Sequence, residues 1–175
     1  MTEQELIQGC IRKDRKSQNR LYSTYAARVI GICRRYIREK EVIDEVVMNT
    51  FLIVFEKIKL YKEDNFQGWI SRIAVNCCLM ELRKKKLLTY EIIERYENFV
   101  DASFENFEKQ DVQKMLDSLP LGARTVFNLY VIEGYKHAEI AKMLNISEGT
   151  SKSQLNFAKE KLKKILKDIN YGNYR

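Results

Sequence analysis

Apolar residues recur every three or four positions along most of this chain, the spacing that places them on one face of an α-helix. The period runs through residues 3–20, 21–38, 43–58 and 69–86, and it resumes after residue 110. The alternating pattern of β-strands is almost absent, and there are only 7 glycines and 1 proline. The pattern therefore predicts an all-α protein.

Two of these helices have stripes that bear on the argument below. The stripe of 43–58 consists of Ile43, Val47, Phe51, Val54 and Ile58. The stripe of 69–86 consists of Trp69, Ile70, Ile73, Ala74, Cys77 and Met80, with Leu82 as a further candidate. We expect both sets to face a core, because neighbours at these spacings lie on one side of a helix.

The C-terminal part predicts short helices at 111–119 and 123–132, separated by Pro120, followed by two helices joined by a tight turn within 133–164. Ser147 is a suitable N-cap for the last helix, because its hydroxyl accepts a hydrogen bond from a first-turn N–H. This is the helix-turn-helix plan, whose second helix enters the DNA major groove. An ordinary helical hairpin with a solvated polar face gives the same pattern.

A helical wheel divides the side chains of that second helix. Four residues are expected to face the core: Ser151, Leu155, Ala158 and Leu162. Five are expected to face away from it: Thr150, Ser153, Gln154, Asn156 and Phe157. Polar side chains of this kind hydrogen-bond base edges, whereas the flanking Lys152 and Lys159 suit phosphates.

Charge is distributed unevenly along the 175 residues, whose net charge is +7. Residues 1–90 hold 18 basic and 11 acidic groups, residues 91–118 hold 3 and 8, and residues 119–175 hold 10 and 5. Basic modules suit a polyanion such as DNA. We therefore predict two small helical domains, 1–88 and 111–175, joined by an acidic linker at 89–110. Lysine-rich helices that are merely soluble remain the alternative.

Several functional classes lack support in the sequence. No apolar run is long enough to span a bilayer, and no signal peptide is evident, which predicts a cytoplasmic protein. The four cysteines lack metal-ligand spacing and His137 is the single histidine, so we expect no zinc site of His and Cys ligands. With no phosphate-binding loop and no nucleophile elbow, we expect no enzyme, no cofactor and no small-molecule substrate.

The helix at 69–86 joins aromatic and basic residues. Phe66 and Trp69 lie at its start, and the run Arg83-Lys84-Lys85-Lys86 ends it. Rings that stack on exposed bases, next to cations that follow the backbone, suit single-stranded nucleic acid. The alternative is that both rings are core anchors and that the lysines complement the helix dipole.

The chain resembles bacterial sigma factors of the extracytoplasmic-function (ECF) group of the sigma-70 class. The stretch DEVVMNTFLIVFEKI (44–58) looks like their core-polymerase-binding helix, and FQGWISRIAVNCCLMELRK (66–84) looks like the segment that melts and reads the −10 element. Residues 119–162 are similar to the −35-binding domain. The resemblance implies a factor that binds core RNA polymerase, directs it to promoters and assists strand opening. It also implies an anti-sigma factor as a further partner.

The resemblance also implies residue roles. The residues implied to bind polymerase are Asp44, Glu45, Met48 and Asn49. Those implied at the melted −10 strand are Phe66, in a base-capturing loop at 61–67, with Arg72, Asn76, Arg83 and Lys84. Those implied at the −35 major groove are Arg124, Lys152, Ser153, Gln154, Asn156 and Phe157.

The sequence departs from the family pattern at three places. Met48 and Asn49 stand where the family commonly has glutamine and an acid, and Ser151 replaces a usual valine. Gln154 and Phe157 stand where arginines are frequent, so we expect less dependence on guanine at their positions. Two other readings stay open: a one-component helix-turn-helix regulator that acts without polymerase, and an adaptor built from two helical bundles.

Overall fold

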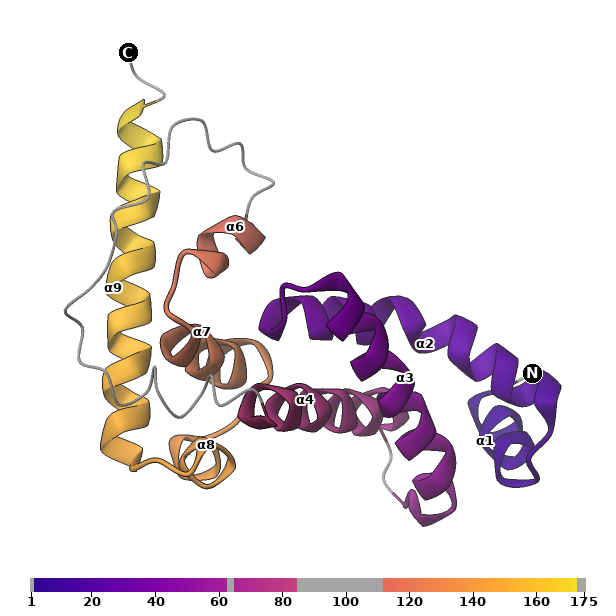
Figure 1. The fold of residues 1–175 in the computed structure, drawn as a ribbon. Helices are drawn as coiled ribbons and strands as arrows, with labels where there is room; N and C mark the ends of the chain where they lie inside the picture. The colour runs from indigo at the N-terminus through magenta and orange to yellow at the C-terminus, as the bar shows by residue number, and fades with distance from the viewer. Residues whose placement is uncertain (1, 63–64, 85–111, 173–175) are drawn as a thin grey trace. The chain divides into compact units, whose positions relative to one another are not determined.

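The computed structural model describes residues 2–62, 65–84 and 112–172 (Figure 1). The chain divides into two compact units, Met1–Leu82 and Arg83–Arg175. Every regular element in the described residues is helical, so the predicted all-α class with two helical domains is confirmed. The expected linker at 89–110 lies outside the described residues, and the domain limits stay a prediction.

The N-terminal unit is built from four α-helices. They are α1 (Glu3–Ile11), α2 (Arg15–Tyr36), α3 (Lys40–Lys57) and α4 (Phe66–Lys84), with a short 3₁₀-helix, η1 (Ile58–Leu60), after α3. The stripe expected on α3 is confirmed: Ile43, Val47, Phe51, Val54 and Ile58 are all buried. The core of this unit therefore forms where the period of three and four predicts it.

The expected helix at 3–20 is wrong in one respect, because a sharp corner interrupts it. Lys13 adopts a left-handed conformation with φ 60°, and Asp14 caps α2 by accepting a hydrogen bond of 2.8 Å from the Ser17 amide. A Cβ atom at Gly9 would lie 2.0 Å from Oγ of Ser17, so the corner requires glycine there. Two hydrogen bonds from Ser17 lower the pKa of Asp14 below its ordinary value.

The buried side of α4 is also shifted from the expected one. Ile70, Ala74, Cys77 and Leu82 are buried as expected, but the buried set also includes Ser71, Val75, Cys78 and Leu79. Trp69 and Ile73 are half-buried, and Met80, expected in the core, is 62% exposed. The expected stripe was thus displaced by about one residue around the helix, because Ser71 was not counted as a core residue.

The C-terminal unit contains α6 (Val112–Asp117), α7 (Leu121–Phe127), α8 (His137–Leu144) and α9 (Glu148–Gly172). A π-helix, η2 (Asn128–Ile132), extends α7. A core cluster of Leu116, Leu119, Ala123 and Ala158 joins α6, α7 and α9. Figure 1 shows α8 beside the N-terminal end of the long helix α9.

The turn between α8 and α9 has the expected form. Asn145 ends α8 in the left-handed conformation, with φ 55°, which asparagine adopts more readily than most residues. Ser147 accepts a hydrogen bond of 2.9 Å from the Thr150 amide, so its predicted capping role is confirmed. The local sequence therefore determines where α9 begins.

Candidate polymerase and nucleic-acid interfaces

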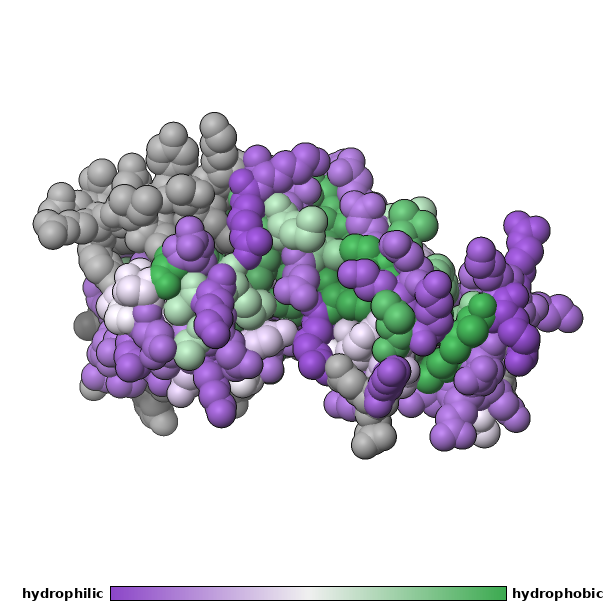
Figure 2. Space-filling view, turned by 90° about the horizontal axis from the view of Figure 1, so that it is seen from below, coloured by the Kyte–Doolittle hydropathy of each residue, from purple (hydrophilic) through white to green (hydrophobic). Residues whose placement is uncertain are grey.

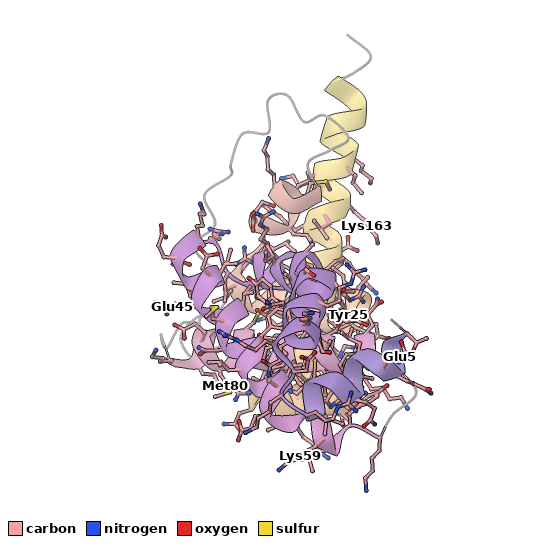
Figure 3. The ribbon with its side chains drawn as sticks, turned by 90° about the vertical axis from the view of Figure 1, so that its right-hand side faces the viewer. Glu5, Tyr25, Glu45, Lys59, Met80 and Lys163 are labelled. Atoms are coloured by element: carbon pink, nitrogen blue, oxygen red, sulfur yellow. The ribbon has the colours of Figure 1, made fainter. Side chains whose placement is uncertain are left out.

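The outer face of α3 carries all four residues assigned to polymerase binding. Asp44, Glu45, Met48 and Asn49 are exposed, and their spacing places them on the side opposite the buried stripe. Figure 3 shows Glu45 at the periphery of this unit. The side chain of Met48 is 59% exposed.

Leu52, one turn beyond Met48, extends this face and is 61% exposed. Nothing in the sequence motifs marks Leu52 as a binding residue, although the buried stripe of α3 already places it on the exposed side. Large apolar side chains gathered beside acidic ones on one exposed helix face mark a protein-binding surface better than single exposed residues do. We call Asp44, Glu45, Met48, Asn49 and Leu52 the α3 face.

The outer face of α4 brings together four of the five residues assigned to the −10 strand. Arg72, Asn76, Arg83 and Lys84 are exposed: Asn76 lies about one helical turn after Arg72, and the adjacent Arg83 and Lys84 lie about two turns after Asn76. Met80 lies on the same side, between Asn76 and Lys84, and Figure 3 shows it at the surface. The cations and the amide therefore line one side of the helix, as a strand-tracking surface requires.

Phe66, the fifth residue of that set, is not available to stack on a base. Its side chain is 1% exposed and is enclosed by other rings. The ring centroids of Tyr25, Tyr61 and Trp69 lie 5.6, 5.0 and 5.6 Å from its own. The assignment of Phe66 to base capture is therefore wrong, because the ring anchors the core. The half-buried rings of Tyr61 and Trp69 lie closer to solvent.

Hydrogen bonds from a cation on α2, which was not among the predicted site residues, hold the start of α4 against α2. Nε of Arg28 donates a 3.1 Å hydrogen bond to Oγ of Ser71, which in turn donates to the Gln67 carbonyl at 2.9 Å. The Gln67 side-chain oxygen, in the amide orientation that satisfies both groups, accepts from the Arg28 guanidinium at 2.6 Å. No local periodic signal marks such a pair, since it joins residues far apart in the chain.

The residues of α9 that were predicted to contact the −35 element separate into an exposed group and a buried or half-buried group. Lys152, Ser153 and Asn156 are exposed, as expected. Gln154 is only 9% exposed, and Phe157 packs against the core cluster of the unit, so neither points away from the core. The expected orientation was wrong because α6, α7 and α8 all contact α9 and widen its buried arc beyond one stripe.

Arg124 also differs from its expected place. Its side chain is 4% exposed, and its Nη1 atom lies 2.6 Å from Oδ1 of Asp117. The guanidinium therefore joins α7 to the end of α6 within the unit. A direct contact of Arg124 with a DNA groove is contradicted by this burial.

A polar contact joins the two helices of the helix-turn-helix. Nδ1 of His137 lies 2.8 Å from Oγ of Ser151, which is fully buried. The Tyr130 ring stacks on the imidazole with centroids 4.5 Å apart, and Nζ of Lys159 lies 5.9 Å from the Tyr130 centroid. The serine that replaces a usual valine thus gains a hydrogen bond in place of an apolar contact.

The described ranges of the chain hold no group of three or more His, Cys, Asp or Glu side chains suited to a metal ion. The helices of the same ranges include none that is both long and apolar enough to cross a membrane. Hydrophobic residues appear among hydrophilic ones on the surface drawn in Figure 2.

Two family models match this chain. The model of Sigma-70 region 2 matches residues 21–87, and the model of Sigma-70, region 4 matches residues 109–162. The chain belongs to the sigma-70 family. Region 2 covers most of α2 and all of α3 and α4, and region 4 covers α6 to most of α9. The exposed residues assigned on α3, α4 and α9 therefore fall within matched residues.

Curated sigma-70 relatives are similar over most of this chain. The ECF RNA polymerase sigma factor SigE of Mycolicibacterium smegmatis is 28% identical over 158 residues, which are 86% of this chain and 62% of that protein. SigM of Mycobacterium tuberculosis is 26% identical over 98% of this chain and 88% of its own length. The sigma-E factor of Haemophilus influenzae is 24% identical, with 97% of each chain covered.

Two solved structures share the fold. CnrH in complex with the cytosolic domain of CnrY has a TM-score of 0.52 at 20% identity and covers 93% of this chain and 96% of its own. RpoE in complex with the anti-sigma factor NepR, from Bartonella quintana, has a TM-score of 0.53 at 18% identity, covering 85% and 96%. The sigma-70 architecture is therefore shared at low sequence identity.

Proposed function

We propose that this chain is an ECF sigma factor: it binds core RNA polymerase, directs it to specific promoters and assists strand opening. The observation that carries the proposal is the combination, in one chain, of sigma-70 regions 2 and 4 in family order, each presenting an exposed face. Such a factor acts where the polymerase is, in the cytoplasm, and catalyses no reaction of its own.

Polymerase binding is assigned to the α3 face. Met48 and Leu52 supply apolar area at its centre, and Asp44 and Glu45 supply negative charge beside it. Apolar contact gives most of the affinity of such an interface, whereas charge steers the encounter and selects the partner. The replacement of family polar residues by Met48 and Asn49 leaves this face more apolar.

Recognition of the melted −10 strand is assigned to α4. Arg72, Arg83 and Lys84 would follow the phosphates, and the amide of Asn76 would hydrogen-bond a base. An unpaired base loses its stacking partners and needs a replacement surface. Because Phe66 is enclosed, we assign that surface to the half-buried rings of Tyr61 and Trp69, whose centroids lie 5.4 Å apart.

Recognition of the −35 duplex is assigned to the exposed N-terminal part of α9. Ser153 and Asn156 would meet base edges in the major groove, and Lys152 would meet a phosphate. Gln154, Phe157 and Arg124 act indirectly, because they hold α9, α6 and α7 in place. The reading surface is therefore smaller than the sequence predicted.

Two weak DNA contacts held on one polymerase reinforce each other through their effective concentration.

An anti-sigma factor is the third partner that we assign. CnrH and RpoE were both solved in complexes, the first with the cytosolic domain of CnrY and the second with the anti-sigma factor NepR. A protein of that kind would restrain this chain by covering the α3 face or the DNA-binding faces.

The decisive experiment is run-off transcription with core RNA polymerase from the source organism, with and without this protein. The templates are the DNA upstream of its own gene and a pool of genomic fragments. Starts that depend on the protein are expected, and their alignment yields the −10 and −35 elements. The contrary result is a core polymerase that supports transcription with another sigma factor but neither binds this chain nor initiates transcription with it. The chain would then be a helix-turn-helix regulator that acts without polymerase.

A further inference from the structure

The first two turns of α4 are attached to α2 by two different side-chain contacts. One is buried: the ring of Phe66 packs edge-on against Tyr25, with centroids 5.6 Å apart and 79° between the ring planes. The other comes from an exposed residue, because Nε of Arg28 donates a 3.1 Å hydrogen bond to Oγ of Ser71. Tyr25 and Arg28 are about one turn apart on α2, so both project from the same side of that helix.

Arg28 binds α4 through all three of its guanidinium nitrogen atoms. Besides Nε, its Nη1 and Nη2 atoms lie 2.6 and 3.1 Å from the side-chain oxygen of Gln67, in the amide orientation that satisfies both groups. Oγ of Ser71 donates onward to the Gln67 carbonyl at 2.9 Å. A planar guanidinium that donates several hydrogen bonds accepts only a narrow range of acceptor positions. The contact therefore fixes the rotation of the start of α4 relative to α2.

Trp69 lies on the turn that Arg28 holds, between Gln67 and Ser71. Its half-buried ring stacks on the buried ring of Phe66, with 20° between the planes, and lies 5.4 Å from the ring of Tyr61. A packed aromatic ring that keeps part of its surface open to solvent is suited to stack on an unpaired base. The direction in which this ring faces depends on the rotation of the same turn of α4.

We propose that Arg28 is a positioning residue for strand opening: it holds the start of α4 so that Trp69 and Tyr61 are placed to receive an unpaired base. The inference rests on the proposed sigma function and adds to it a residue of α2. Arg28 acts through the rings in this role, because its guanidinium nitrogens donate to groups within the protein.

The hydrogen bonds of Arg28 contribute placement more than stability. Arg28 and Gln67 are both exposed, and charged contacts in that setting add little to the free energy of unfolding. A binding site, in contrast, loses function when its side chains are held about 1 Å too loosely. We therefore expect variants of Arg28 to fold normally and to lose base capture.

The placement of the ring is measured directly, because Trp69 is the only tryptophan of the chain. Acrylamide quenching of its fluorescence in the free, full-length protein reports how accessible the indole is. Arg28→Lys keeps the charge but loses the planar fork, and Ser71→Ala removes one acceptor, so both should increase the quenching constant. Arg20→Lys is the matched control, since Arg20 is exposed on the same helix about two turns earlier, and its quenching should equal that of the native protein.

Two single-stranded probes separate base capture from phosphate contact. Both are oligonucleotides of about 12 nucleotides, one with randomised bases and one with the same sugar–phosphate backbone but no bases. Arg28→Lys should bind the base-bearing probe at least about fivefold more weakly, the lower limit for one stacked base, and should bind the abasic probe as the native protein does. Urea denaturation checks that each variant keeps the native stability. If Arg28→Lys is destabilised, Ser71→Ala makes the same comparison.

Three results would overturn the positioning role. The first is a quenching constant that is equal in the native, Arg28→Lys and Ser71→Ala proteins. The second is native affinity for both probes in Arg28→Lys together with equal weakening on both probes in Arg28→Ala, which would make Arg28 a phosphate contact. The third is a native protein that binds the two probes equally, because the rings would then capture no base.

Neither measurement requires polymerase or a promoter, so the two proposals fail separately. A protein that gives the expected quenching and probe binding but directs no transcription would refute the sigma assignment alone. A protein that directs transcription while Arg28→Lys behaves as the native chain in both measurements would refute the positioning role alone.

Discussion

Arg124 and Asp117 form an ion pair, with Nη1 and Oδ1 2.6 Å apart, that joins α7 to the end of α6. Arg124 is almost fully buried, whereas the carboxylate side chain is 33% exposed. The arginine that the family resemblance placed at the −35 groove thus supports the scaffold on which α9 rests. Loss of DNA binding in an Arg124 variant would consequently report on the fold.

We predict that Arg124→Ala lowers the free energy of unfolding by about 1–3 kcal/mol, because the partly exposed carboxylate of Asp117 loses its ion-pair partner. Urea denaturation of the full-length protein measures this change. Affinity for −35 duplex, corrected for the folded fraction, should be unchanged. If the variant has normal stability but binds the −35 duplex more weakly, Arg124 contacts DNA directly.

Lys152→Ala should show the opposite behaviour, because Lys152 is exposed on α9. Its stability should match that of the unaltered protein, and its affinity for −35 duplex should fall for all sequences alike. The slope of log affinity against log salt should flatten by about 0.9 if one phosphate contact is lost. Titrations at several salt concentrations measure the slope, and an unaltered slope would exclude the phosphate contact.

The α3 face gives a prediction about polymerase binding. Leu52→Glu should weaken affinity for core polymerase by at least about tenfold, because a charge replaces an apolar anchor in a desolvated contact. Ile11→Glu is the matched control, since Ile11 is another exposed apolar residue, at 38%, on α1. Surface plasmon resonance on immobilised core compares the two. Equal losses of affinity for core polymerase in both variants would show that the α3 face is not the polymerase-binding surface.

The sequence predicted helices well where one face of a helix is buried. On α3 the stripe from Ile43 to Ile58 is buried, and the complementary positions are exposed. The residue at which α9 starts was also predictable, because capping by Ser147 depends only on residues within one turn. Local chemistry was sufficient in both cases.

Contacts between distant segments were not predictable in the same way. Phe66 is enclosed partly by Tyr25 from another helix, and Gln154 and Phe157 are buried because several helices pack on α9. Arg28 reaches Ser71 across 43 positions of the chain. A periodic pattern shows which side of a helix is apolar but not how many neighbours it has, so polar residues near the stripe were misplaced.

The contact between His137 and Ser151 predicts a measurable coupling within the helix-turn-helix. In a double-mutant cycle of His137→Ala and Ser151→Ala, we expect a coupling free energy of about 0.5–1.5 kcal/mol, the range for a typical intramolecular hydrogen bond. Urea denaturation of the four proteins gives the value. Strictly additive losses would mean that the two side chains do not stabilise each other.

The final prediction concerns alkaline pH and the first two helices. Oη of Tyr25 donates a 3.1 Å hydrogen bond to Oε2 of Glu3, and burial, followed by this bond, raises the pKa of Tyr25 to about 12. The pKa of an unfolded tyrosine is about 10, so folding favours the neutral phenol. Its contribution is fully present below pH 10 and is lost as the pH rises toward 12. By then, roughly 2 kcal/mol of unfolding free energy should disappear.

Tyr25→Phe isolates this contribution, because phenylalanine keeps the ring but cannot ionise. The variant should be less stable at neutral pH by the value of one hydrogen bond, about 0.5–1.5 kcal/mol. Its stability should then fall less steeply between pH 10 and 12 than that of the unaltered protein. Comparing the two proteins cancels the titration of the other tyrosines and of lysine. Parallel curves over that interval would mean that Tyr25 ionises as easily in the folded protein as in the unfolded chain, and that its contact with Glu3 does not tie α1 to α2.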